Sequence, residues 1–105
     1  MDNRTVEVLT RYKEMLKRLG VNPERVIVFG SHARGKAGEY SDIDVVIISE
    51  DFARMDLRER LEILGIAAAR IMEPVQALGY TAEEFEARGE GSFIGDEVKG
   101  IGVEV

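Results

Sequence analysis

The sequence has no cysteine, so it contains neither a disulfide framework nor a metal site built from thiolates. Its apolar runs are short, and none reaches the roughly 20 residues that a membrane-spanning helix needs. No basic segment followed by an apolar one opens the chain, as a secretory leader would. Together these absences predict a soluble, unprocessed protein of the reducing cytoplasm.

The chain also lacks an excess of positive charge. It has 14 Lys and Arg against 20 Asp and Glu, which gives a formal net charge of −6 at pH 7. Because surfaces that bind the phosphate backbone of DNA or RNA are usually basic, we expect no general nucleic-acid binding. A single nucleotide held together with metal ions is compatible with this charge, since the metal ions supply the positive charge.

The length of 105 residues corresponds to one domain, which can bury a core of its own. No internal repeat or low-complexity segment interrupts it. The hydrophobic pattern alternates between helix-like and strand-like segments, so we expect an α/β (α+β) fold with a small mixed sheet of about four strands flanked by helices. The expected helices span 4–19, 31–36, 57–70 and a short segment after 81, and the expected strands span 25–29, 43–48, 74–80 and 101–105.

Local signals mark the ends of these elements. Asp56 with Glu59, and Thr81 with Glu84, have the spacing of capping boxes at helix starts. In the helix over 57–70, one face carries apolar or small side chains that we expect to be buried: Leu57, Leu61, Leu64 and Ala68. The small residues of its GIAAAR segment allow close packing, either against the sheet or against another copy of the chain in a homo-oligomer.

The stretch FGSHARGKAGEYSDIDVVII, residues 29–48, carries the clearest chemical signal. Asp42 and Asp44 stand two residues apart at the start of a strand, so their side chains share one face, roughly 6–7 Å apart at Cα. Ile43 and Val45 point to the opposite face, into the core. Two neighbouring carboxylates repel each other, and a divalent cation such as Mg²⁺ removes that repulsion by binding oxygens of both.

The turn before the acids favours an anion. Gly30 has no Cβ, so a phosphate can approach the backbone there. Ser31 is expected to cap a short helix, whose free N–H groups and hydroxyl would donate to a phosphate. His32 is expected to be an exposed residue of that helix rather than a catalytic base.

The direction of the two strands decides whether these groups meet. If the strands over 25–29 and 43–48 ran parallel, Gly30 would lie a strand length from Asp42 and Asp44, roughly 15 Å. If they run antiparallel, the end of the first lies beside the start of the second. A nucleotide site therefore requires an antiparallel pair.

This combination resembles the nucleotidyltransferase superfamily of the DNA polymerase β type. The matching motifs are Gly30-Ser31, Arg34-Gly35 and Asp42-Ile43-Asp44, and the match is sharpest over residues 26–48. The short chain is similar to the minimal nucleotidyltransferases of bacteria and archaea. The resemblance implies the nucleotidyltransferase fold and transfer of a nucleoside monophosphate, with ATP as substrate and Mg²⁺ as cofactor, onto an acceptor hydroxyl.

The resemblance also implies a role for each matching residue. Gly30 and Ser31 would hold the β- and γ-phosphates, and Asp42 and Asp44 would bind two Mg²⁺ ions at the reacting phosphate. Arg34 would touch a phosphate; pairing with Glu39 or another neighbour is an equal alternative.

The family usually has a third carboxylate on the next strand, and this sequence departs from that pattern. Aligning the YTAEEFE end of the strand over 74–80 places Gln76 where the acid would be. An amide oxygen can bind a cation but brings no charge. Glu73 is the nearest acid, and on a regular strand it would face away from the side of Gln76.

Family members of this size commonly pair with a small helical protein of the HEPN class, as antitoxin and toxin ribonuclease. The resemblance therefore implies that the acceptor is a hydroxyl, such as that of a tyrosine, on a HEPN-type partner. The alternative is a catalytically weak or inactive module of the same fold that binds and neutralises a helical partner. The third hypothesis is an α/β domain without a nucleotide site.

The charged, glycine-rich stretch Glu83–Phe93 is expected to be a solvated helix and hinge, with a partner contact as its alternative.

Overall fold

The computed structural model describes residues 1–35, 38, 42–89 and 91–105. In this part of the chain a four-stranded sheet has the order β3-β2-β1-β4. β1 is antiparallel to β2 and to β4, whereas β2 and β3 are parallel, which confirms the mixed α/β fold class. The strands are β1 Arg25–Phe29, β2 Ile43–Ile48, β3 Val75–Tyr80 and β4 Val103–Glu104.

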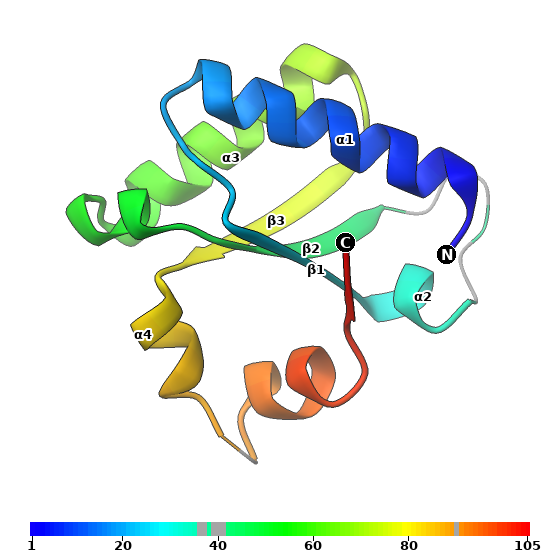
Figure 1. Ribbon diagram of the computed structural model, residues 1–105, viewed down its shortest axis with the longest axis vertical. Helices are drawn as coiled ribbons and strands as arrows, with labels where there is room; N and C mark the ends of the chain where they lie inside the picture. Colours follow the sequence, from blue (N-terminus) through cyan, green and yellow to red (C-terminus); the bar gives the residue numbers. More distant parts are fainter. Residues whose placement is uncertain (36–37, 39–41, 90) are drawn as a thin grey trace.

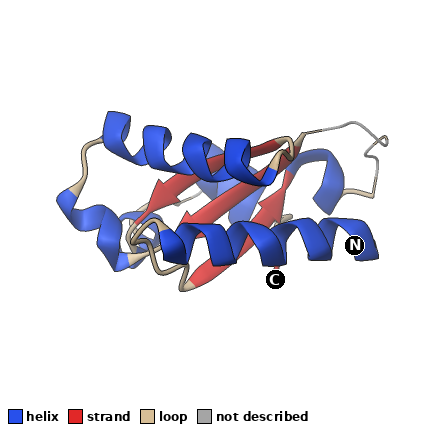
Figure 2. Cartoon of the chain, turned by 90° about the horizontal axis from the view of Figure 1, so that it is seen from above, coloured by secondary structure: helices blue, strands red, loops and turns tan. Residues whose placement is uncertain are grey.

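Helices α1 (Asn3–Arg18) and α3 (Leu57–Ile71) lie side by side over one face of the sheet (Figures 1 and 2). The predicted capping box is present at the start of α3, where the side chains and backbones of Asp56 and Glu59 bond reciprocally. The two helices and the sheet enclose the larger core. Its largest fully buried side chains include Tyr12, Phe52, Leu9, Leu16 and Ile47.

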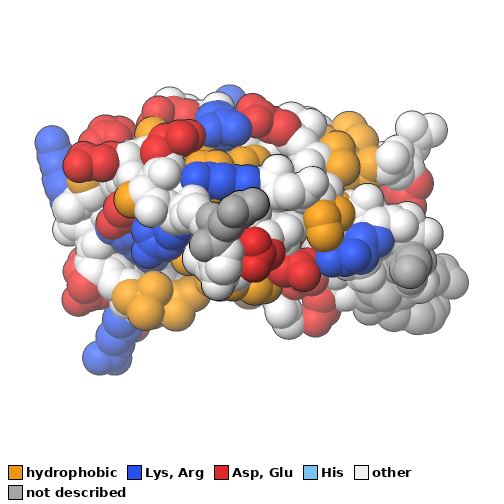
Figure 3. Space-filling model, turned by 90° about the horizontal axis from the view of Figure 1, so that it is seen from below, with side chains coloured by type: hydrophobic (Ala, Val, Ile, Leu, Met, Phe, Trp, Pro, Cys, Tyr) orange, Lys and Arg blue, Asp and Glu red, His pale blue; other side chains and the backbone are white. Residues whose placement is uncertain are grey.

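The opposite face of the sheet is covered by two shorter helices, α4 (Ala82–Glu86) and η2 (Ile94–Lys99), which lie below it in Figure 1. The capping box of Thr81 and Glu84 is present as predicted. This second core is smaller and consists of Ile27, Phe29, Val46, Ile48, Phe85, Ile94 and Val98. Figure 3 shows this side of the molecule, where acidic and basic side chains are interspersed and apolar side chains are exposed between them.

Two expectations about helices are wrong in detail. The helix that follows β1 is α2 (Gly30–Ala33), a single turn, and it has no side-chain cap, because the chain already turns at Gly30 and Ser31 is its second residue. Lys36, its expected end, lies outside the described residues. Leu57 and Leu61 on α3 are 69% and 45% exposed rather than buried, because α3 covers β3 at the edge of the sheet and directs these side chains outward.

Two short helices were not anticipated at all. Between β2 and α3 the chain forms η1 (Glu50–Arg54), a 3-10 helix whose Phe52 is fully buried. Directly after the stretch expected to be a helix and hinge, η2 begins at Ile94 and packs Ile94 and Val98 against the sheet. In the part of the chain that the structure describes, no helix combines the length and apolar character that crossing a bilayer requires.

Candidate functional site

The antiparallel pairing of β1 and β2 brings the predicted site together. Phe29, the last residue of β1, lies directly opposite Asp44 near the start of β2. The turn at Gly30 therefore begins beside Asp44 rather than at the far end of the sheet. β1 and β2 therefore have the antiparallel arrangement that a nucleotide site at these residues requires.

Gly30 allows this close approach in two ways. Its φ is +70°, a conformation that side chains rarely adopt. A Cβ built at this position would lie 2.5 Å from Oδ2 of Asp44. The backbone of α2 and the carboxylate of Asp44 thus share a space that any larger residue would fill.

The two acids differ in their surroundings. Asp42 is exposed, whereas Asp44 is only partly exposed, and Ile43 between them is buried on the other face as predicted. Burial raises the pKa of Asp44, and the charge of nearby Asp42 raises it further, while His32 opposes the shift. The charge of Asp44 is therefore destabilised in the folded protein, as expected for a carboxylate placed next to another one.

Gln76 stands beside the acids on the neighbouring strand. It lies opposite Asp44 in the parallel pairing of β2 and β3, and its Nε2 donates to Oδ2 of Asp42 at 2.7 Å. Glu73 lies before the start of β3 and pairs with Arg4 at 3.1 Å. Gln76, and not Glu73, is therefore the residue that adjoins the acid pair.

The donor set fits a hard divalent cation. Within the described residues there is no cluster of three or more His, Cys, Asp or Glu able to hold a metal ion. Asp42 and Asp44 nevertheless offer carboxylate oxygens, and a half-turn of the amide of Gln76 would bring its oxygen to the place of Nε2. Oxygen donors of this kind are those that Mg²⁺ takes, together with waters and substrate phosphates.

Arg34 and His32 both have surroundings that the sequence did not predict. Arg34 forms an ion pair with Glu97 of η2 at 2.7 Å, while Glu39, the pairing partner considered above, lies outside the described residues. His32 is not an exposed helix residue, since it is half-buried and its buried Nδ1 has no hydrogen-bond partner among the described residues. The contact of Arg34 with phosphate stays a prediction.

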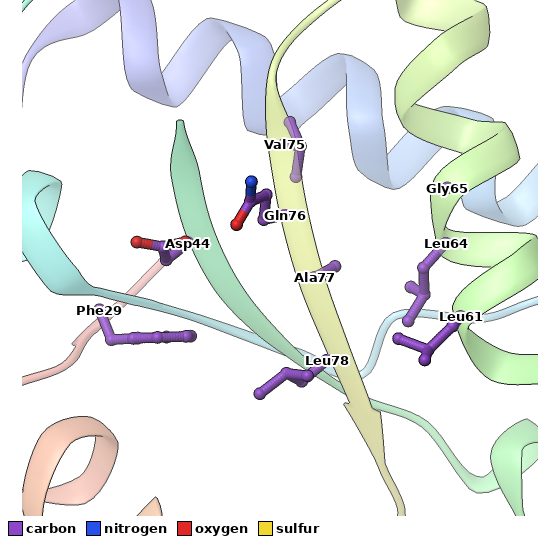
Figure 4. Close-up of a pocket in the computed structure, with 9 residues that line it drawn as sticks. All are labelled: Phe29, Asp44, Leu61, Leu64, Gly65, Val75, Gln76, Ala77 and Leu78. Atoms are coloured by element: carbon purple, nitrogen blue, oxygen red, sulfur yellow. The ribbon is translucent and has the colours of Figure 1, made fainter. Parts of the chain in front are cut away.

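A cavity of about 390 Å³ opens beside the acid pair (Figure 4). Asp44 and Gln76 form its polar end, while the rest of its lining comes from β1, β3 and α3 and is mostly apolar. The sequence does not single out these apolar lining residues, because their apolar character predicts a core position equally well. The lining residues are Phe29, Asp44, Leu61, Leu64, Gly65, Val75, Gln76, Ala77 and Leu78.

Comparison with known proteins agrees with the geometry. The model of the family "Nucleotidyltransferase domain" matches residues 9–99. A Methanocaldococcus jannaschii protein named "Putative protein adenylyltransferase MJ0141" is 32% identical over 101 residues, covering 95% of this chain and 97% of the relative. "Protein adenylyltransferase MntA" of Thermococcus cleftensis is 36% identical over 72 residues, covering 63% of this chain and 71% of the relative.

A solved structure shows the same fold. The crystal structure of a "putative nucleotidyltransferase" from Sulfolobus solfataricus superposes with a TM-score of 0.57 at 22% identity, covering 94% of this chain and 79% of that one. The predicted nucleotidyltransferase fold is thereby confirmed. The chain belongs to the nucleotidyltransferase domain family, and within it to the minimal type.

Proposed function

We propose that this protein transfers AMP from ATP to a hydroxyl group on a partner protein. The hydroxyl oxygen bonds to the α-phosphorus of ATP, the bond from that phosphorus to the oxygen bridging the α- and β-phosphates breaks, and pyrophosphate leaves while the hydroxyl proton passes to solvent. The observation that carries the proposal is the register of β1 and β2, in which Phe29 lies opposite Asp44 and the turn at Gly30 adjoins the acid pair. The names of two relatives as protein adenylyltransferases support both the nucleotide and the kind of acceptor.

In this proposal the turn binds the triphosphate. Gly30 lets the phosphates reach the backbone, and Ser31 donates its hydroxyl and backbone N–H. Because α2 is only one turn long, its dipole contributes little, and individual donors provide the attraction. Arg34 joins them if the incoming phosphate displaces Glu97, an exchange between two exposed groups that costs little.

Asp42 and Asp44 would hold two Mg²⁺ ions, with the amide oxygen of Gln76 as a further, uncharged ligand. When bound, these ions neutralise charge on the transferring phosphoryl group and on the attacking and leaving oxygens. The two carboxylates orient the triphosphate relative to the acceptor, and most of the rate enhancement comes from this positioning and from charge stabilisation.

The partner is proposed to be a HEPN-type helical protein, with this chain as the antitoxin of a toxin–antitoxin pair in the cytoplasm. The net charge of −6 would complement a basic face on a ribonuclease. The identity of the protein encoded next to this chain would test the pairing directly: a helical protein with an Arg-x₄–₆-His motif supports it, and an unrelated neighbour counts against it.

Label transfer tests the activity. The protein is incubated with the partner, Mg²⁺ and ATP labelled on the α-phosphate, beside a variant carrying Asp42→Ala and Asp44→Ala. We expect label on the partner with the natural protein and at least a thousandfold less with the variant. Absence of transfer, or equal transfer by both proteins, would refute the proposal.

One observation favours a second function. The amide of Gln76 donates to Asp42, so one acid of the pair is already hydrogen-bonded, and the described residues place no third carboxylate in a metal-holding cluster with it. Such a site suits a module that binds the nucleotide weakly and neutralises its partner by covering it. This alternative gains if the double-alanine variant still neutralises the partner, and it fails if neutralisation is lost while the complex still forms.

A further inference from the structure

In the described part of the chain β3 is the last strand on its side of the sheet, so one of its edges has no described strand beside it. The carbonyl of Pro74 accepts from Ile43 N–H at 2.8 Å, and the carbonyl of Tyr80 accepts from Ser49 N–H at 3.0 Å. Backbone groups alternate in direction along a strand. The even-numbered residues of β3 therefore direct their backbone groups toward β2, and the odd-numbered ones direct them outward.

The outward residues are Val75, Ala77 and Gly79. The carbonyl of Gly79 is used within the chain, since Arg60 donates to it at 3.1 Å, which agrees with the outward direction. No strand among the described residues pairs with the N–H and carbonyl of Ala77, two residues earlier. An edge with unpaired groups of this kind is a template for one more strand.

Side chains form walls on both sides of this edge. On one side lie Leu61, Leu64 and Gly65 of α3, and on the other lies Leu78 of β3. Figure 4 shows the strand running between the two sets, with Asp44 and Gln76 at one end. The groove is therefore apolar along its length and continuous with the acid pair.

We propose that the edge of β3 binds an extended segment of the acceptor protein as an added strand, and so delivers its hydroxyl to Asp44. This inference rests on the proposed function and names the surface through which the protein substrate is recognised. Main-chain hydrogen bonds to Ala77 would give affinity, and alternate apolar side chains of the segment would enter the two walls of the groove.

The spacing of the strands selects the acceptor side chain. A residue of the added strand opposite Gln76 lies two strand spacings from Asp44, about 9–10 Å at Cα. Its side chain projects on the same face as Asp44. A hydroxyl at the end of a long side chain crosses this distance over Gln76, whereas the short side chains of serine and threonine leave it beyond reach.

Two substitutions separate the edge from the nucleotide site. Ala77→Pro removes the outward N–H without removing a hydrogen bond to β2. Edge strands tolerate proline at such a position, where the N–H points away from the sheet. Leu61→Asp places a charge in the wall of the groove. Ile66→Asp is the matched control, because Ile66 lies on the same helix and is 45% exposed, as Leu61 is, but does not line the cavity.

The test uses a display library of ten-residue peptides with a central tyrosine or serine, incubated with the protein, Mg²⁺ and α-labelled ATP. We expect the natural protein to label tyrosine peptides with flanking apolar residues. Ala77→Pro and Leu61→Asp should each reduce binding and labelling of the best peptide about tenfold or more, and Ile66→Asp less than about twofold. Calorimetric binding of ATP with Mg²⁺ should be unchanged in all three variants.

Each other outcome overturns the inference or what it rests on. If ATP binds but no peptide is labelled, or both groove variants label peptides as well as Ile66→Asp does, an added strand is not the substrate. If sedimentation shows a dimer that Ala77→Pro converts to a monomer, the edge binds a second copy of this chain instead. Failure of the natural protein to bind ATP refutes the proposed function itself.

Discussion

The two ends of β3 differ in how the surroundings affect a carboxylate: one end stabilises its charged form, and the other destabilises it. At the end near α4, Arg60 donates to both carboxylate oxygens of Glu84, at 2.7 and 3.1 Å, and its side chain is only 11% exposed. These hydrogen bonds lower the pKa of Glu84 to about 2. At the other end Asp42 and Asp44 adjoin Gln76, and burial and like charge raise the pKa of Asp44.

The difference in carboxylate environment distinguishes an end of β3 that stabilises the fold from an end suited to a functional site. The end with Arg60 is a hydrogen-bonded corner that ties α3, η1, β3 and α4 together, so it stabilises the fold. The end with the acids disfavours its own charge, which destabilises the folded protein slightly. A cation bound there, as proposed above, would remove this penalty and stabilise the complex. Perturbed carboxylates of this kind are typical of functional sites.

The largest effect is expected at the corner. Arg60 also donates to the carbonyls of Phe52 and Met55 at 2.7 and 3.1 Å, so Arg60→Met leaves several acceptors without a donor. We expect the free energy of unfolding to fall by about 3 kcal/mol in urea titrations. Arg58→Met is the control, since the side chain of Arg58 is 86% exposed and pairs with no described residue other than Glu62. It should change stability by less than about 0.5 kcal/mol. Equal effects would show that the corner does not stabilise the fold.

The next effect is expected at the turn. Gly30 and Gly35 both have a φ of +70°, but only Gly30 has Asp44 at the position of a Cβ. Gly30→Ala should lower the free energy of unfolding by about 2 kcal/mol and Gly35→Ala by about 1 kcal/mol, as chemical denaturation would measure. Because only Gly30→Ala displaces Asp44, it alone should weaken ATP binding. Unchanged ATP affinity in Gly30→Ala would contradict the claim that the turn at Gly30 and the carboxylate of Asp44 adjoin each other in one nucleotide site.

A third prediction concerns the uncharged residue beside the acid pair, Gln76, and its effect on the rate of transfer. Gln76→Glu removes the donor to Asp42 and adds a third carboxylate at the same place. With Mg²⁺ present, we expect the rate of label transfer to rise about tenfold, equivalent to about 1.4 kcal/mol. With a chelator in place of Mg²⁺, repulsion among three carboxylates should lower the melting temperature. A rate that falls with Mg²⁺ present would show that the amide of Gln76 is required.

The smallest effect concerns pH. The folded pKa of Glu84 lies below its usual value of 4.5, so Glu84 contributes stability above pH 4.5 that is lost as the pH falls toward about 2. Because the side chain of Glu84 is 38% exposed, we expect a contribution of only about 1 kcal/mol. Glu84→Gln should flatten the dependence of unfolding free energy on pH in this window. If the unfolding free energy of Glu84→Gln falls with decreasing pH as it does in the natural protein, Glu84 does not contribute to the pH dependence.

The sequence predicted the elements that rest on strong local patterns. The bounds of β1 and β2 and both capping boxes match the prediction, because β-branched runs and the S/T/D-x-x-E spacing act locally. It also predicted which acids would adjoin the turn, provided that the strands were antiparallel. The exposure of Leu57 and Leu61 was not predictable, because a helical pattern does not reveal that its helix covers the edge of a sheet.

The groove beside the acids was equally hidden in the sequence. Leu61 and Leu78 have the character of core residues, and only the position of β3 at the end of the strand order leaves them beside an open edge. The hydrogen bond from Gln76 to Asp42 also depends on the parallel register of β2 and β3, which involves residues more than thirty positions apart. Non-local pairing of this kind is not encoded in any short motif.

Calorimetric titration with ATP, in the presence and absence of Mg²⁺, tests most directly whether the turn at Gly30 and the acids form one site. We predict saturable heat with Mg²⁺, and at least tenfold weaker binding both without a divalent ion and in a variant carrying Asp42→Asn and Asp44→Asn. Binding of equal strength in all three titrations, or no binding at millimolar ATP, would contradict a single site that holds the nucleotide through cations.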